Sequence, residues 1–230
     1  MERSHHYIIL AELFRYPQEG YKERIRECYH VLRSHNLEAA EEIEPFVDFV
    51  KHEPAFRVEE VFNKTFHIQA ICYLDLGYVL FGEDYKRGEF LVNMKREQRN
   101  INNNCGEELA DNLANVLTLM ALTEDEDFLD EFAVRIVIPA IKKMLYEFEA
   151  SRMDLKRKIM KKKHKVLIQE DLPNKNIYQH ALQSLLMVME QDFVNVHYEE
   201  TVVNPTIGGN FLVNCDSCSV DHKPALAVTT

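Results

Sequence analysis

The stretch 73-YLDLGYVLFGEDYKRGEFL-91 decides the fold, because it joins two apolar periodic segments through a short turn. Apolar side chains recur at helical spacing over residues 73–81 and stop at Gly82, and glycine commonly ends a helix. Glu83-Asp84 follow, and acidic side chains are favourable at the positive end of a helix dipole. The pattern therefore predicts two helices joined by a tight turn, the second running towards Asn100.

Two residues of the second segment need a reason beyond helix formation. Gly88 lies inside the expected helix, where glycine costs about 1 kcal/mol relative to alanine. We therefore expect another part of the backbone to approach it closely. Arg87 lies near the positive end of the same helix dipole, which is unfavourable for a cation. We expect Arg87 to pair with a carboxylate, either Asp84 or Asp111.

The rest of the chain predicts an all-α, single-domain bundle of about eight to nine helices over residues 1–198. The chain has 230 residues, of which 46% are hydrophobic, and only 7 Gly and 7 Pro interrupt its long apolar-periodic segments. It has no uninterrupted apolar run of about 18 residues, so no membrane span is expected. The N-terminus resembles a first helix and not a signal peptide. Five scattered cysteines suit a reducing compartment, so we expect a cytoplasmic protein. Helices are expected over 5–16, 19–35, 37–51, 58–66, 107–122, 124–145 and 177–193.

Charge is distributed unevenly along the chain. The net charge of −11 disfavours nucleic-acid binding, yet residues 152–165 contain eight Lys or Arg and one Asp. The basic helical segment, residues 151–168, is interpreted as a solvated face, with a docking surface for an acidic partner or anionic lipid as the alternative. Residues 199–230 have no helical period and are expected to form an extended C-terminal tail.

Few residues suggest catalysis or metal binding. Cys215, Cys218 and His222 have metal-ligand spacing, but a structural zinc site needs a fourth ligand. Our expectation is therefore no metal site, with these three residues as the alternative. His5-His6 are neighbours in sequence, do not share a helix face, and are expected to be solvated. No known catalytic or nucleotide-binding motif occurs, so the chain is not expected to be an enzyme.

Three segments, in order, resemble the nitrate reductase delta-subunit family of molybdoenzyme assembly chaperones. LAELFRYP (10–17) resembles the end of the family's first helix. Residues 80–91 resemble its G-x-x-x-x-R-G-x-x-L core, with Gly82, Arg87, Gly88 and Leu91 in place. ELADNLANVL (108–117) resembles its E-L-P-D-x-L-P-x-x-L segment. The resemblance covers about residues 7–148, so the basic segment and the tail lie outside it.

The third segment departs from the family pattern. Ala110 and Ala114 replace both prolines, and Asn112 replaces a residue that is often aromatic. Because alanine is a good helix former, these substitutions are expected to lengthen the helix.

The resemblance implies an all-helical cytoplasmic chaperone that binds the immature catalytic subunit of a molybdopterin oxidoreductase, often at its N-terminal segment. The chaperone keeps this client competent for cofactor insertion and prevents premature membrane docking or export. It would bind no cofactor stably itself, because the molybdopterin belongs to the client. Carried over position by position, the client-binding candidates are Tyr73, Asp84, Arg87, Gly88, Glu108 and Asp111.

Two other functions stay open at this point. One is an interaction or scaffold protein that acts through the basic segment and the tail. The other is a metal-binding protein that uses Cys215, Cys218 and His222. The sequence does not name the client. It is compatible with both a monomer and a homodimer.

Overall fold

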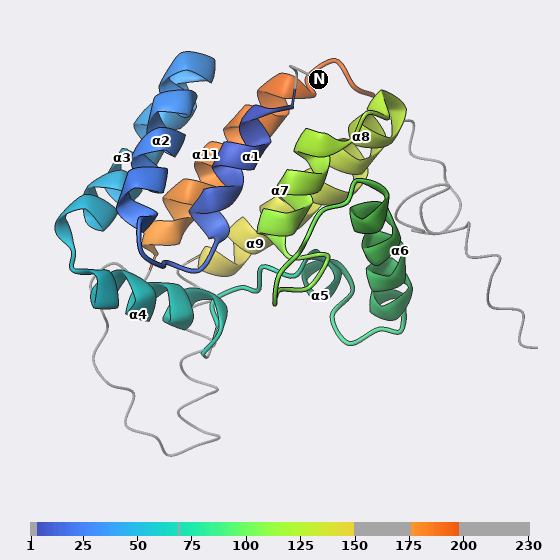
Figure 1. Ribbon diagram of the computed structural model, residues 1–230, viewed down its shortest axis with the longest axis horizontal. Helices are drawn as coiled ribbons and strands as arrows, with labels where there is room; N and C mark the ends of the chain where they lie inside the picture. The colour runs from blue at the N-terminus through green and yellow to red at the C-terminus, as the bar shows by residue number, and fades with distance from the viewer. Residues whose placement is uncertain (1–3, 69, 150–175, 198–230) are drawn as a thin grey trace, which may run out of the picture.

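Helices make up the regular structure of residues 4–68, 70–149 and 176–197, which the computed structural model describes (Figure 1). The predicted all-α, single-domain bundle is confirmed. Within these ranges no helix is both long and apolar enough to cross a membrane. The basic segment, the tail, Cys215, Cys218 and His222 lie outside the described residues. The helices are α1 (His6–Leu10), η1 (Ala11–Phe14), α2 (Tyr21–His35), α3 (Leu37–His52), α4 (Ala55–Phe66), α5 (Leu76–Phe81), α6 (Lys86–Asn100), α7 (Leu113–Leu122), α8 (Glu126–Phe132), the π-helical turn η2 (Ala133–Val137), α9 (Ile138–Phe148) and α11 (Ile177–Asp192).

Helix α7 lies at the centre of the bundle. Every residue from Leu113 to Ala121 is buried, which fits its near-continuous apolar sequence. A helix that is apolar on all sides must be covered on all sides. Helices α1 and η1 pack along it, and α8 lies beside it in Figure 1.

Helix α11 packs the end of the described chain against its beginning. It packs along α3 and α9, although 124 residues (53–176) separate it from α3 in sequence. Ser184 on α11 is buried and donates a hydrogen bond of 2.7 Å to the carbonyl of Ala39 on α3. Tyr178 packs against Phe46, Phe62 and Phe66, with ring centroids 4.9–5.7 Å apart. This aromatic cluster connects α3, α4 and α11.

Prolines and acids act in the helices much as expected. Asp125 begins α8 by accepting a hydrogen bond of 2.9 Å from the amide of Phe128. Pro139 lies in the first turn of α9, directly after the π-helical turn. Pro45, in contrast, lies inside α3 without ending it.

The segment between α6 and α7 is held by side chains from both helices. Gln98 donates to the carbonyls of Ala110 and Asn115, at 2.9 and 3.0 Å. Asn115 donates to the carbonyl of Leu109 at 2.9 Å, and Asn103 donates to Gln98 at 2.7 Å. Gln98 and Asn115 are both buried. Buried amides that satisfy loop carbonyls replace the hydrogen bonds that a helix would supply.

Helix α7 consequently begins later than the sequence predicts. We expected it to begin at residue 107, but it begins at Leu113, where the side chain of Asn112 accepts from the amide of Ala114 at 3.1 Å. Ala110 lies in the preceding loop, so alanine in place of the family's first proline does not lengthen the helix. Asparagine is a strong N-cap residue, and here the cap decides where the helix starts.

Candidate functional site

A carboxylate meets a helix start at the corner between α5, α6 and the segment before α7. The amide of Gly77, in the first turn of α5, donates a hydrogen bond of 2.9 Å to Oδ2 of Asp111. Asp111 is 1% exposed. Its other oxygen, Oδ1, is also buried and makes no hydrogen bond within the described residues. The negative charge is favourable at this helix end because unpaired amides point outward there.

The backbone draws the same two segments together. The amide of Leu76 donates to the carbonyl of Asp111, and the amide of Leu113 donates to the carbonyl of Leu74, both at 2.9 Å. These bonds form an isolated antiparallel bridge between Asp75 and Asn112. The start of α5 and the start of α7 are therefore fixed relative to each other by backbone and side chain together.

Gly77, and not Gly88, is the glycine that permits a close approach. A Cβ atom at position 77 would lie 2.7 Å from Oδ2 of Asp111 and 3.0 Å from a ring carbon of Phe90. A Cβ atom at Gly88 would meet nothing within 4 Å in the described part of the chain, and Gly88 is exposed. The predicted close approach at Gly88 is wrong, because the contact lies on α5 rather than on α6.

Asp75 is the second carboxylate of the corner. Burial, followed by the charge of Asp111, raises its pKa to about 6, while the nearby charge of Arg87 acts in the opposite direction. Burial also raises the pKa of Asp111, against the hydrogen bond from Gly77 and the charge of Arg87. Two carboxylates that share a partly desolvated place disfavour each other's ionisation. Protonation of Asp75 therefore responds to pH around 6.

Arg87 forms a stack with two tyrosines. Its guanidinium lies over the ring of Tyr78, 5.0 Å from the centroid, and the ring of Tyr73 meets Tyr78 edge-on at 4.4 Å. A guanidinium over an aromatic face is attracted by the ring quadrupole. Tyr73 is 41% exposed, so one aromatic surface of the stack faces solvent.

The predicted pairing of Arg87 with Asp84 or Asp111 is wrong. In the described chain Arg87 makes no ion pair with Asp84 or Asp111. Its positive charge instead acts through space on Asp111 and lowers the pKa of that carboxyl. The side chain of Asp84 is occupied elsewhere, because it accepts a hydrogen bond of 2.9 Å from the amide of Lys86 and so begins α6.

The six client-binding candidates thus divide into two groups. The corner brings Tyr73, Arg87 and Asp111 together. Glu108 lies beside it, since Asn112 donates to Glu108 at 3.4 Å and the charge of Glu108 contributes to raising the pKa of Asp75. Asp84 and Gly88 serve helix α6 and do not join the others. We call Tyr73, Asp75, Tyr78, Arg87, Glu108 and Asp111 the corner surface.

Sequence reasoning missed Asp75 and Tyr78 as members of this surface. Both lie in the quoted stretch, three residues apart, which is the spacing of neighbours on a helix. This spacing of Asp75 and Tyr78 was the available signal. The carboxylate of Asp111 could not be placed beside Asp75 from sequence alone, because a separation of 36 positions says nothing about contact.

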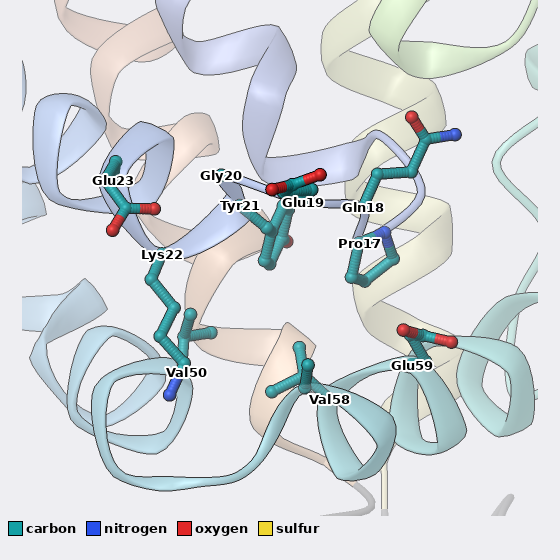
Figure 2. Close-up of a pocket in the computed structure, with 11 residues that line it drawn as sticks. Pro17, Gln18, Glu19, Gly20, Tyr21, Lys22, Glu23, Val50, Val58 and Glu59 are labelled. Atoms are coloured by element: carbon teal, nitrogen blue, oxygen red, sulfur yellow. The ribbon is translucent and has the colours of Figure 1, made fainter.

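A separate hollow lies between the start of α2 and α4, far along the chain from the corner surface. Figure 2 shows its lining, with Pro17, Val50 and Val58 as apolar residues and Glu19 and Glu59 among the acids. Its volume is about 240 Å³, below the roughly 300–1,000 Å³ of typical small-molecule sites. The amine of Lys22 donates to the carbonyls at the end of α3, so this lysine serves the fold.

In comparisons with known proteins, no family model matches the chain and no curated protein matches it significantly. At the corner surface Tyr73 and Glu108 are exposed, Asp75, Tyr78 and Arg87 are partly buried, and Asp111 is buried beneath them. The corner surface has the chemistry to bind a peptide that offers both apolar and basic side chains.

Proposed function

We propose that the chain is an assembly chaperone for a respiratory molybdopterin oxidoreductase of the nitrate reductase or nitrite oxidoreductase type. The observation that carries the proposal is the meeting of Tyr73, Arg87 and Asp111 at one corner. Arg87 and Asp111 come from two segments that resemble the chaperone family, and the three residues are separated by up to 38 positions in sequence.

The corner surface binds the client's N-terminal segment. Its exposed aromatic, Tyr73, offers apolar contact area at a low cost in side-chain entropy. Asp75 and Glu108 attract basic side chains of the client, and complementary charge mainly sets specificity and the rate of association. Arg87 keeps the tyrosine stack in one arrangement, because its guanidinium covers Tyr78.

The rigidity of the corner matters as much as its chemistry. The hydrogen bond from Gly77 to Asp111 and the backbone bridge beside it hold two segments at a fixed spacing. A surface that is ordered before binding loses less conformational entropy when the peptide arrives. Gly77 and Asp111 are therefore positioning residues of the surface.

The consequence for the client is protection during maturation. While its N-terminal segment is held, the catalytic subunit stays competent for cofactor insertion and does not dock at the membrane or leave the cytoplasm early. The molybdopterin cofactor belongs to the client, and the chaperone binds none stably. No catalytic step is assigned to the chaperone.

Co-purification tests this function. The tagged full-length chain is expressed in its native host under respiratory conditions, and bound proteins are identified by mass spectrometry. The proposal expects the cofactor-free catalytic subunit of a molybdopterin oxidoreductase, at a lower yield with Tyr73→Ala. Failure to recover any such subunit with the unaltered chain would contradict it.

A further inference from the structure

Three side chains that can bind a metal ion meet where the beginning and the end of the described chain come together. His6 begins α1, His35 ends α2, and Asp192 ends α11. One ligand atom from each lies within 4.8 Å of the other two. The Nε2 atom of His35 is 2.7 Å from Oδ1 of Asp192, and the Nε2 atom of His6 is 2.8 Å from Oδ2. The expectation that His6 is solvated is therefore wrong.

The geometry at His6 is poor for a hydrogen bond. Its Nε2 atom is buried and satisfies no hydrogen-bond criterion, although the carboxylate oxygen of Asp192 is only 2.8 Å away. The two imidazole rings are stacked, with centroids 4.2 Å apart, so both present Nε2 to one carboxylate. A buried nitrogen that is close to a carboxylate but misaligned with it is better satisfied by a cation that both atoms coordinate.

Neighbouring residues hold the carboxylate in place. Tyr7 donates to Oδ2 of Asp192 at 2.7 Å. Gln191 donates to the backbone carbonyl of His35 at 3.2 Å and accepts from Asn36 at 2.7 Å. These contacts leave the two carboxylate oxygens of Asp192 facing the Nε2 atoms of His6 and His35.

The donor set selects the class of ion. Two imidazoles and one carboxylate suit Zn²⁺ and related transition metals, whereas Mg²⁺ and Ca²⁺ prefer oxygen ligands only. Ligand atoms around tetrahedral Zn²⁺ lie about 3.3 Å apart, so small side-chain rotations bring the three atoms into position. His35 is the most open, with a side chain 30% exposed against 11% for His6 and 7% for Asp192. An ion can therefore enter from the His35 side, where a water completes the coordination.

We propose that His6, His35 and Asp192 bind one divalent transition-metal ion of the Zn²⁺ class. The ion joins the first helix of the bundle to the ends of α2 and α11, which come together only in the folded chain. It stabilises this end of the molecule and is independent of client binding at the corner surface.

Zinc titration of the full-length, chelator-stripped protein tests the proposal. The tail contains Cys215, Cys218 and His222, so the measurements use a Cys215→Ser/Cys218→Ser background. We expect one Zn²⁺ per chain by calorimetry, and an increase in Tm on the order of 5–10 °C at a hundredfold excess over Kd. Mg²⁺ should leave Tm unchanged. Absence of Zn²⁺ binding in this background would overturn the proposal.

Single substitutions assign the ligands. His35→Gln and His6→Gln should each weaken Zn²⁺ binding at least about tenfold, whereas His180→Gln should not change it. His180 is a matched control, because it also lies 2.8 Å from a carboxylate, that of Glu42, with no third ligand among the residues that the structure describes. Equal affinity of both ligand variants and the parent would overturn the assignment.

Cobalt provides a readout that needs no substitution among the three ligands. Co²⁺ is added to the same Cys215→Ser/Cys218→Ser protein. Its absorption spectrum should show visible d–d bands typical of nitrogen and oxygen ligands. It should lack the sulfur-to-metal charge-transfer band of a cysteine ligand. This spectrum supports the proposal even if a histidine variant fails to fold. A spectrum of Co²⁺ in water only would contradict it.

Discussion

The carboxylate of Asp111 lies 2.9 Å from the amide nitrogen of Gly77, in the space where any other residue at position 77 would carry its Cβ atom. This one contact fixes the start of α5 against the segment before α7. It also places a buried carboxylate beside Asp75 and Arg87. The corner surface depends on it.

Two glycine substitutions test the contact. Gly77→Ala should lower the free energy of unfolding by about 2–4 kcal/mol, because the new methyl group overpacks the corner and displaces Asp111. Gly88→Ala should raise it by about 0.5–1 kcal/mol, since the position is helical and open. Urea denaturation of the two variants measures both. Similar effects of the two substitutions would show that close approach at Gly77 is unimportant.

The carboxylate pair predicts a pH dependence. The folded-state pKa of Asp75 is about 6, raised from its ordinary value of 3.8. The folded state therefore binds this proton more tightly than the unfolded state, and stability from Asp75 is lost as pH rises from about 4 through 6. After allowance for partial exposure, Asp75→Asn should stabilise the protein by about 1–2 kcal/mol at pH 7.5.

The stability difference between this variant and the parent should be much smaller at pH 4, where Asp75 is protonated in the folded state and about half protonated in the unfolded state. Unfolding free energies of the variant and parent across pH 4–8 give the measurement. Glu83→Gln is the control, because Glu83 is exposed in the turn before α6 and should show no such difference. A constant difference at every pH would contradict the raised pKa.

The buried amide of Gln98 should matter for the loop before α7. Gln98→Ala removes the donor to the carbonyls of Ala110 and Asn115, which costs about 1–3 kcal/mol when buried carbonyls lose a partner. Hydrogen exchange of Leu113 and its neighbours should speed up as the loop loosens. Asn100→Ala, at the exposed end of α6, should leave this exchange unchanged.

Deletion separates the chaperone from the scaffold interpretation. A chain without residues 152–168 and 199–230 should keep most of its affinity for the client, because the corner surface lies outside both segments. Pull-down of the co-purified catalytic subunit by the two chains provides the comparison. Loss of binding on deletion would favour a scaffold that acts through the basic segment and tail.

Local patterns in the sequence predicted the fold well. Apolar periodicity placed the helices, and Gly82, with a φ of 63°, ends α5 as expected. Features decided by distant contacts were not predictable. The late start of α7 depends on Gln98 and Asn115, whose partners lie 6 to 17 residues away.

The candidate site was only partly predictable, again because distant contacts decide which residues meet. The family resemblance offered Tyr73, Arg87 and Asp111 as candidates, but a helical glycine in a sequence does not reveal which atoms face it. Gly88 was therefore chosen over Gly77. His6 is the clearest case of a contact that the sequence does not reveal. Its two partners, His35 and Asp192, lie 29 and 186 positions away.

Peptide binding at Tyr73 tests the central claim most directly. A labelled peptide of the N-terminal segment of the co-purified catalytic subunit is titrated with the full-length protein by fluorescence anisotropy. Tyr73→Ala should raise Kd at least about tenfold, as loss of an exposed aromatic anchor does. Phe56→Ala, which removes an aromatic of 69% exposure on α4, should change Kd by less than about twofold. Equal Kd values for Tyr73→Ala and the unaltered chain would contradict the corner surface as the client-binding site.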